Sequence, residues 1–173
     1  QRGFKAALAE SCTGGYVAKL FTDIPGSSAW FDFGLVTYSN ASKQRCLGVS
    51  DETLAEHGAV SEPVVLEMAA GALALGNAHC AVAISGVAGP DGGSPRHPVG
   101  DVWLALALRR AGGAVEAVAV HRHFSGQRDE IRRQAAAAAL MLFLEEQDRK
   151  TVYIYSTVWH IPSTPVIHAS RGP

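Results

Sequence analysis

The stretch AESCTGG, from Ala9 to Gly15, joins a predicted strand to a predicted helix. The apolar run 6–9 leads into it, and the apolar residues of 16–21 follow it with the spacing of one helix face. A sharp turn of this kind gathers hydroxyls and free backbone N–H groups, and the positive end of a helix favours an anion. The stretch therefore predicts a nucleophilic serine or an anion-binding turn. The simpler alternative is a helix cap built from Ser11 and Thr13.

The composition is that of one globular domain. The chain has 173 residues, of which 47% are hydrophobic and 18% charged, with a formal net charge of −1. This charge gives no support to binding of nucleic acid or of a membrane surface. No apolar run approaches the ~20 residues of a membrane span. Three cysteines without a paired or metal-binding spacing favour reduced thiols, a cytosolic protein and no metal.

Strands and helices alternate along the chain. Strands are predicted at 6–9, 31–39, 80–84, 102–108 and 115–120, the last two as a hairpin. Helices are predicted after Gly15, from Asn40 as cap to Leu47, over 51–57, from Ser61 to Gly76, and from Ser125 onward. The segment Ser85–Gly100 holds five glycines and three prolines and predicts a long loop, whose length points to function.

The segment 150–173 differs from the rest. Residues 151–158 alternate as in a strand, whereas Pro162, Pro165 and Gly172-Pro173 are typical of a linker. We expect residues 1–149 to form the domain and 150–173 to be a tail without catalytic residues.

Seven motifs carry a resemblance to a known family. They are AESCTGG (9–15), TDIPGSSAWF (22–31), VTYSN with Lys43 (36–43), HGAVSEPVV (57–65), SGVAGPDGGS (85–94), PVGDVW (98–103) and FSGQRDEIRRQA (124–135). In this order, between about Ala6 and Leu144, they resemble the C-terminal domain of the CinA (competence/damage-inducible protein) family. Stand-alone bacterial members of that family are nicotinamide mononucleotide amidohydrolases.

The resemblance implies a fold and an activity. The implied fold is a three-layer α/β/α sandwich with a mixed sheet, in agreement with the predicted elements. The implied reaction converts nicotinamide mononucleotide to nicotinate mononucleotide and ammonia, which returns the pyridine ring to NAD synthesis. It also implies a bacterial cytoplasmic protein that needs no cofactor and forms a homo-oligomer, a dimer or larger.

Three features depart from the family pattern. The family normally has a helix before AESCTGG, and only Gln1–Lys5 remain of that region here, so this helix is expected to be missing. The family's Gly-Asp-Arg is Gly126-Gln127-Arg128 here, and the segment after Arg149 has no family counterpart. The N-terminal nucleotide-processing domain of larger members is likewise expected to be missing.

Amide hydrolysis needs a nucleophile, a base and donors for the oxyanion. Ser11 is the predicted nucleophile, with Cys12 as its rival. Lys43 is the predicted base, provided that burial lowers its pKa. Tyr38 either relays the serine proton or packs in the core. No Asp–His pair is visible in the sequence, so a Ser-His-Asp triad has little support.

Substrate contacts are predicted from two loops and a helix start. The turn supplies Thr13, Gly14 and Gly15, and the long loop supplies Ser85, Gly86 and Gly89, because glycines allow close approach of backbone N–H groups. Arg128, together with Ser125-Gly126, is the first candidate for the phosphate, and Arg132 is the second. A solvated helix face is the alternative for both arginines.

Two other functions stay open at this stage. The domain could be a catalytically silent nucleotide-binding or assembly module, or it could hydrolyse another small amide. Release of ammonia from nicotinamide mononucleotide separates these possibilities.

Overall fold

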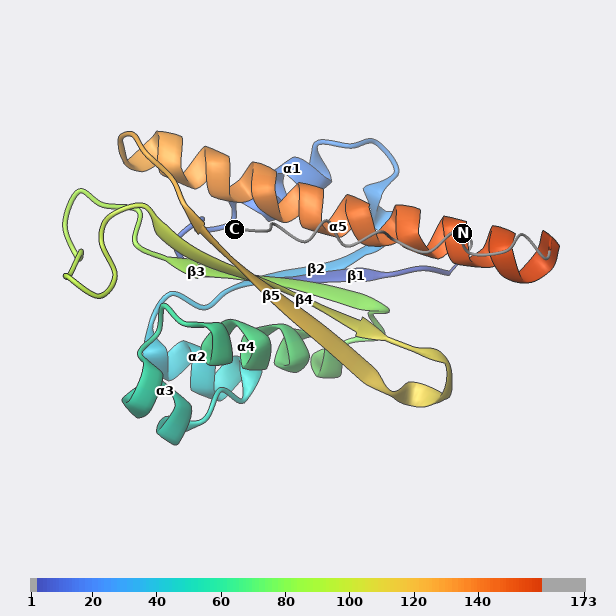
Figure 1. The fold of residues 1–173 in the computed structure, drawn as a ribbon, viewed down its shortest axis with the longest axis horizontal. Helices are drawn as coiled ribbons and strands as arrows, with labels where there is room; N and C mark the ends of the chain where they lie inside the picture. Colours follow the sequence, from blue (N-terminus) through green and yellow to red (C-terminus); the bar gives the residue numbers. More distant parts are fainter. Residues whose placement is uncertain (1–2, 160–173) are drawn as a thin grey trace, which may run out of the picture.

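A five-stranded mixed sheet lies between two layers of helices in the computed structural model, which describes residues 3–159, with side chains described as far as Leu144 (Figure 1). The strand order is β2-β1-β3-β4-β5. β1 pairs in parallel with β2 and β3, whereas β3, β4 and β5 pair antiparallel. The strands are β1 (Ala6–Glu10), β2 (Phe31–Val36), β3 (Cys80–Gly86), β4 (Asp101–Arg109) and β5 (Val115–His123).

The helices divide between the two faces of this sheet (Figure 1). One face carries α1 (Tyr16–Thr22) and α5 (Arg128–Trp159), and the other carries α2 (Asn40–Leu47), α3 (Asp51–His57) and α4 (Glu62–Leu75). Short 3₁₀ turns lie at Ser27–Ala29 and Ala111–Gly113. The predicted three-layer sandwich with a mixed sheet is confirmed.

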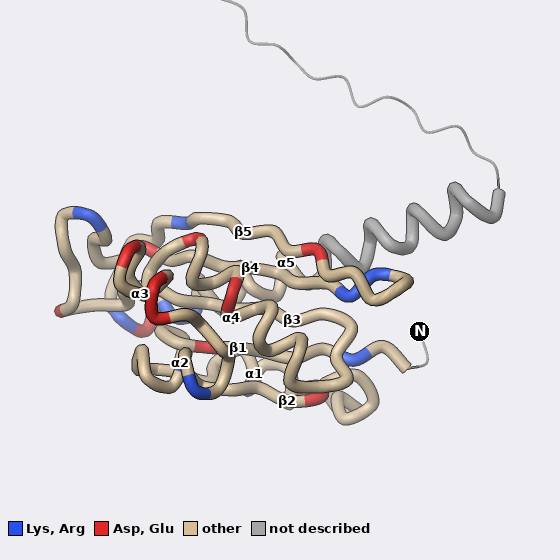
Figure 2. Tube along the Cα trace, turned by 90° about the horizontal axis from the view of Figure 1, so that it is seen from below, with Lys and Arg blue, Asp and Glu red and all other residues tan. Residues whose placement is uncertain are grey.

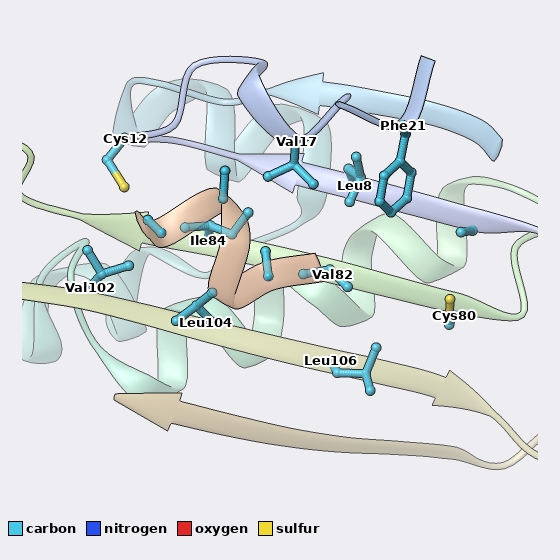
Figure 3. Packing of buried hydrophobic residues seen from close by; sticks show 14 of the residues in the cluster. Leu8, Cys12, Val17, Phe21, Cys80, Val82, Ile84, Val102, Leu104 and Leu106 are labelled. Atoms are coloured by element: carbon cyan, nitrogen blue, oxygen red, sulfur yellow. The ribbon is translucent and has the colours of Figure 1, made fainter. Parts of the chain in front are cut away.

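Alternate residues of the central strands pack into two separate hydrophobic cores, one on each face of the sheet. Leu8 and Val82 pack toward α1 and α5, together with Phe21 and Leu104 (Figure 3). Their neighbours Ala7, Ala9 and Ala81 pack toward α4 on the other face. β1 is buried along its whole length. The end of β1 is therefore packed on both faces, which fixes the direction in which the following residues leave the strand.

Several predicted boundaries shift by a few residues. β2 ends at Val36 rather than Ser39, because Ser39 is the N-cap of α2 and shares a capping box with Ser42. Asn40, predicted as the cap, is instead the first helical residue. The long helix α5 begins at Arg128 rather than Ser125, since Gly126 has a φ of 122° that a helix does not accept.

The strand predicted over 151–158 is wrong. α5 continues through Trp159, and no glycine or proline occurs between Arg128 and that residue. Extending an existing helix is easier than starting a strand, so the β-branched residues of this segment do not end it. The prolines of the predicted linker lie outside the described residues, and the domain boundary at 149 stays a prediction. No helix in residues 3–159 combines the length and apolarity needed to cross a membrane.

Candidate active site

Ser11 directly follows β1, and its side chain lies on the α2 side of the sheet. Leu8 and Glu10 face α1, so the alternation of a strand turns Ser11 to the opposite face. The Ser11 backbone N–H continues the ladder by donating to the Ile84 carbonyl at 3.0 Å. Ser11 is buried, with 7% of its surface exposed. The nucleophile candidate is thus fixed by the sheet rather than by a mobile loop.

Lys43 reaches this serine from α2. Its Nζ lies 3.0 Å from Ser11 Oγ and 2.8 Å from the Thr37 carbonyl oxygen, and the side chain is 1% exposed. Burial lowers the pKa of Lys43 to about 8, because a charged ammonium loses its hydration in this position. An amine of this pKa is a minority neutral species near physiological pH, and that neutral form can accept a proton from the hydroxyl.

Glu10 occupies the N-terminus of α1. Its carboxylate accepts hydrogen bonds from the backbone N–H groups of Gly15, Val17 and Ala18 at 2.8–3.2 Å. The prediction that Ser11 and Thr13 cap this helix is therefore wrong, because the Glu10 carboxylate engages the donors at its start. A glutamate six residues before the first helical residue is not an N-cap by spacing, so sequence reasoning missed it. The side chain fixes the turn that carries Ser11.

The surroundings of Cys12 disfavour a reactive thiolate. Burial raises the pKa of its thiol to about 11, so the sulfur stays protonated at neutral pH and lacks the reactivity of a thiolate. Thr13 is also buried, and its Oγ1 has no hydrogen-bond partner within the described residues. The Arg132 guanidinium donates to the Thr13 carbonyl at 2.8 Å and lies over the Tyr16 ring at 5.9 Å. Arg132 therefore supports the turn.

Arg128 joins three distant segments of the chain. One η-nitrogen donates to the Gly89 carbonyl at 2.6 Å and the other to the Tyr38 hydroxyl at 3.1 Å. Tyr38 is 60% exposed, so the prediction that it packs in the core is wrong. Its hydroxyl is bonded to Arg128 rather than to Ser11 or Lys43. The backbone N–H of Gln127 donates to Glu130 at 2.7 Å, which leaves the start of α5 already capped by a carboxylate.

The remaining predicted contacts divide between backbone and structural roles. The Ser85 hydroxyl is buried and donates to the Ala59 carbonyl at 2.6 Å, so it ties β3 to the segment before α4. Gly86 has no room for a side chain, because a Cβ would lie 2.6 Å from the Asp101 carbonyl oxygen. Gly14 and Gly15 both have positive φ values, of 60° and 92°, which the turn requires.

A histidine cluster surrounds Asp101, and the sequence did not reveal it. The Asp101 carboxylate lies 3.1 Å from His97 Nδ1, 2.5 Å from His121 Nε2 and 4.0 Å from His123 Nδ1. Strand pairing of β4 with β5 creates this cluster, which no local spacing predicts. None of the three rings bonds to Ser11 among the described residues, so a Ser-His-Asp triad is not formed. Within residues 3–159 no group of His, Cys, Asp or Glu is suited to hold a metal ion.

Residues 1–147 match the model of the CinA C-terminal domain. The chain belongs to this family. The nicotinamide-nucleotide amidohydrolase PncC of Escherichia coli K12 is 57% identical over 145 residues, which are 84% of this chain and 86% of that protein. A CinA-like protein of Anaeromyxobacter (strain K) is 54% identical over 82% of this chain but only 33% of its own length.

Solved structures of the CinA superfamily agree with the fold. The competence damage-inducible protein A of Klebsiella pneumoniae has a TM-score of 0.78 at 40% identity, covering 85% of this chain and 88% of its own. The competence/damage inducible protein of Agrobacterium tumefaciens has a TM-score of 0.74 at 46% identity, covering 82% and 85%. The CinA resemblance carried by the seven sequence motifs is thereby confirmed.

Proposed function

We propose that this chain hydrolyses the carboxamide of nicotinamide mononucleotide to nicotinate mononucleotide and ammonia, with Ser11 as nucleophile and Lys43 as general base. The observation that carries the proposal is the buried contact of 3.0 Å between Lys43 Nζ and Ser11 Oγ. The 57% identity with an amidohydrolase acting on a nicotinamide nucleotide supplies the substrate. A buried lysine amine beside a buried serine hydroxyl is the arrangement that activates a serine for acyl transfer.

The first half-reaction transfers the acyl group to the enzyme. Neutral Lys43 accepts the Ser11 Oγ proton as the oxygen attacks the carboxamide carbon, and the carbonyl becomes a tetrahedral oxyanion. The C–N bond then breaks, and the Lys43 ammonium returns the proton to the departing nitrogen, which leaves as ammonia. The product of this half-reaction is an ester between Ser11 and the pyridine carboxyl group, with the ribosyl phosphate still attached to the ring.

The second half-reaction uses water in the same way. Lys43 accepts a proton from the water as its oxygen attacks the ester carbon. Collapse of the second tetrahedral intermediate breaks the bond to Ser11 Oγ, and the proton returns to the serine. Nicotinate mononucleotide leaves with its new carboxyl group ionised, and the dyad is restored without any redox or metal step.

Two backbone N–H groups remain to stabilise the oxyanion. Glu10 engages the first donors of α1, and the N–H of Gly14 donates to the Ser11 carbonyl at 3.0 Å. The N–H groups of Cys12 and Thr13 are directed at the Cys12 sulfur, a weak acceptor, and donate to no backbone carbonyl among the described residues. Their position directly after the nucleophile matches the usual source of an oxyanion donor. We assign the oxyanion contact to them.

The Arg128 guanidinium is assigned to the phosphate of the substrate. It lies beside the exposed Tyr38 hydroxyl and the Gly89 carbonyl, between the long loop and α2. A guanidinium offers paired donors that suit phosphate oxygens, and a tyrosine hydroxyl adds a further donor. Arg132, engaged with the Thr13 carbonyl, positions the turn instead.

The setting of the enzyme is also part of this proposal. The partner is a small mononucleotide rather than nucleic acid or membrane, and the place of action is the bacterial cytoplasm. No cofactor is required by the steps above. Self-association of the chain is included as well.

The decisive experiment is an assay of the purified chain with nicotinamide mononucleotide. Ammonia and nicotinate mononucleotide should appear in equal amounts, and hydroxylamine should intercept the acyl-enzyme as a hydroxamate. The Ser11→Ala variant serves as the inactive control. A thermal shift with the mononucleotide, without ammonia release by the native chain, would instead favour the silent binding module. Ammonia from other small amides alone would favour the third function.

A further inference from the structure

β5 forms an open edge of the sheet with unusual exposure. It is the last strand in the order of the described sheet, and none of its nine residues is buried. Val115 is 49% exposed and Val118 is 53% exposed. The strand runs along the outer margin of the molecule (Figure 2). Its register with β4 is unbroken and it contains no proline or lysine, so a bulge, a proline and a lysine are all missing from this edge, and its charged residues Glu116 and Arg122 lie toward its two ends.

Hydrogen-bond alternation determines which backbone groups of β5 are free. Just beyond its two ends, Arg110 N–H donates to the Ala114 carbonyl and Phe124 N–H donates to the Gly100 carbonyl. Even-numbered residues therefore bond to β4, and the odd-numbered residues present N–H and C=O groups to the open side. A strand added on that side would bond to residues 115, 117, 119, 121 and 123.

We propose that this edge pairs antiparallel with β5 of a second copy of the chain, about a two-fold axis at Ala119. In this register Ala119 faces the partner's Ala119 as a hydrogen-bonded pair. Val118 then lies opposite the partner's Val120, and Glu116 lies opposite the partner's Arg122. The central valines are covered. At each end of the stripe Glu116, which also pairs with Arg110 of its own chain at 2.7 Å, faces the partner's Arg122.

Charge complementarity selects this register over its neighbours. Shifting the pairing by two residues in one sense puts Glu116 opposite a valine, and shifting it in the other sense puts Arg122 opposite a valine. Arg122 has one hydrogen bond within the described residues, from its Nη1 to the His121 carbonyl at 2.8 Å. That carbonyl faces the open side and would accept from the partner strand, which releases the guanidinium for the partner's Glu116. The net charge of −1 leaves little repulsion between two copies.

Disulfide trapping tests the register directly. Ala119→Cys places two thiols on the two-fold axis, where Cα atoms of a hydrogen-bonded pair lie ~5.5 Å apart and can be bridged. Val118→Cys is the matched control, because its two copies would be diagonal at roughly 7–8 Å, beyond easy bridging. Both variants are made with Cys46→Ser, which removes the partly exposed native thiol. Mild oxidation should convert most of the Ala119→Cys chain to a covalent dimer and little of the Val118→Cys chain.

Charge exchange tests the end contacts. In light scattering with size-exclusion chromatography, Arg122→Glu should weaken the dimer by roughly tenfold or more, since like charges then face each other twice. Adding Glu116→Lys to that variant should restore much of the affinity. Melting temperatures of all variants show whether each one folds.

Three results would overturn the proposal. One is a native chain that stays monomeric at assay concentrations. Another is equal cross-linking of the two cysteine variants. The third is a dimer that Arg122→Glu leaves unchanged, which would place the interface on another surface.

Discussion

Lys43 Nζ and Ser11 Oγ lie 3.0 Å apart, although 32 positions of sequence separate the two residues. Ser11→Ala and Lys43→Ala should each reduce kcat by roughly 10³-fold or more, and the double variant should be little worse, because the two groups act as one unit. Lys43→Arg should be equally inactive, since a guanidinium does not give up its proton. Single-turnover ammonia release measures all four. Native-like rates in Ser11→Ala would exclude the serine as nucleophile.

The rate should depend on pH through Lys43. Its pKa of about 8 means that the neutral base is the minor form at pH 6 and the major form at pH 9. With Lys43 as base, kcat/KM should rise about tenfold for each pH unit below 8 and level off above it. A profile measured in buffers of constant ionic strength checks this expectation. A flat profile between pH 6 and 9 would contradict the assignment.

Replacing Lys43 by Met should separate stability from activity. The folded-state pKa lies below the usual value of 10.5, so the unfolded chain binds more protons and native stability rises as pH increases above about 8. Lys43→Met removes this dependence and the cost of a buried charge. Relative to the native chain, the variant should gain about 1 kcal/mol more at pH 6 than at pH 9, as seen in denaturant titrations. Its amidohydrolase activity should be absent.

Glu10 should contribute to stability through the start of α1. Glu10→Gln keeps one acceptor oxygen and turns an NH₂ group toward helix donors, so it should cost about 1–3 kcal/mol. That cost corresponds to a fall in Tm of about 2–4 °C per kcal/mol. Glu52→Gln, an exposed acid in the first turn of α3, is the control and should change Tm little. Equal Tm values for the two variants would show that Glu10 does not stabilise the turn.

Arg128→Ala should affect phosphate recognition more than chemistry. Loss of a charge-assisted contact of ~1.5–3 kcal/mol predicts a KM for nicotinamide mononucleotide raised roughly tenfold to hundredfold. The effect on free nicotinamide should be small, if that amide is turned over. Arg133→Ala is the control, because Arg133 is exposed and pairs with Asp129 at 3.2 Å on the solvent side of α5. An unchanged KM in Arg128→Ala would place the phosphate elsewhere.

The central elements of the fold could be predicted because their signals are local. Apolar runs such as 80–84 and helix ends such as Gly76 each act within a few positions. The strand predicted beyond Thr151 failed because alternation of side chains does not outweigh a helix that is already formed.

The sequence predicted only those parts of the site that lie within the family motifs. Ser11 and Lys43 are brought together as expected, whereas the Glu10 contacts with α1 and the Arg128 contact with Tyr38 depend on tertiary geometry. The Asp101 cluster likewise depends on which strand lies beside β4. Such contacts span up to 90 positions, and no periodicity of one chain encodes them.

The alternation at the end of β1 also makes its length critical. Glu10 contacts α1 and Ser11 contacts Lys43 of α2, because successive side chains along a strand point to opposite faces of the sheet. Inserting or deleting one residue within Ala6–Glu10 would exchange the two faces, burying the hydroxyl against α1 and turning the carboxylate toward Lys43. Point substitutions in β1 and single-residue indels should therefore differ sharply in tolerance. Catalysis therefore depends more on which positions of the strand face each layer than on the identity of the individual residues of β1.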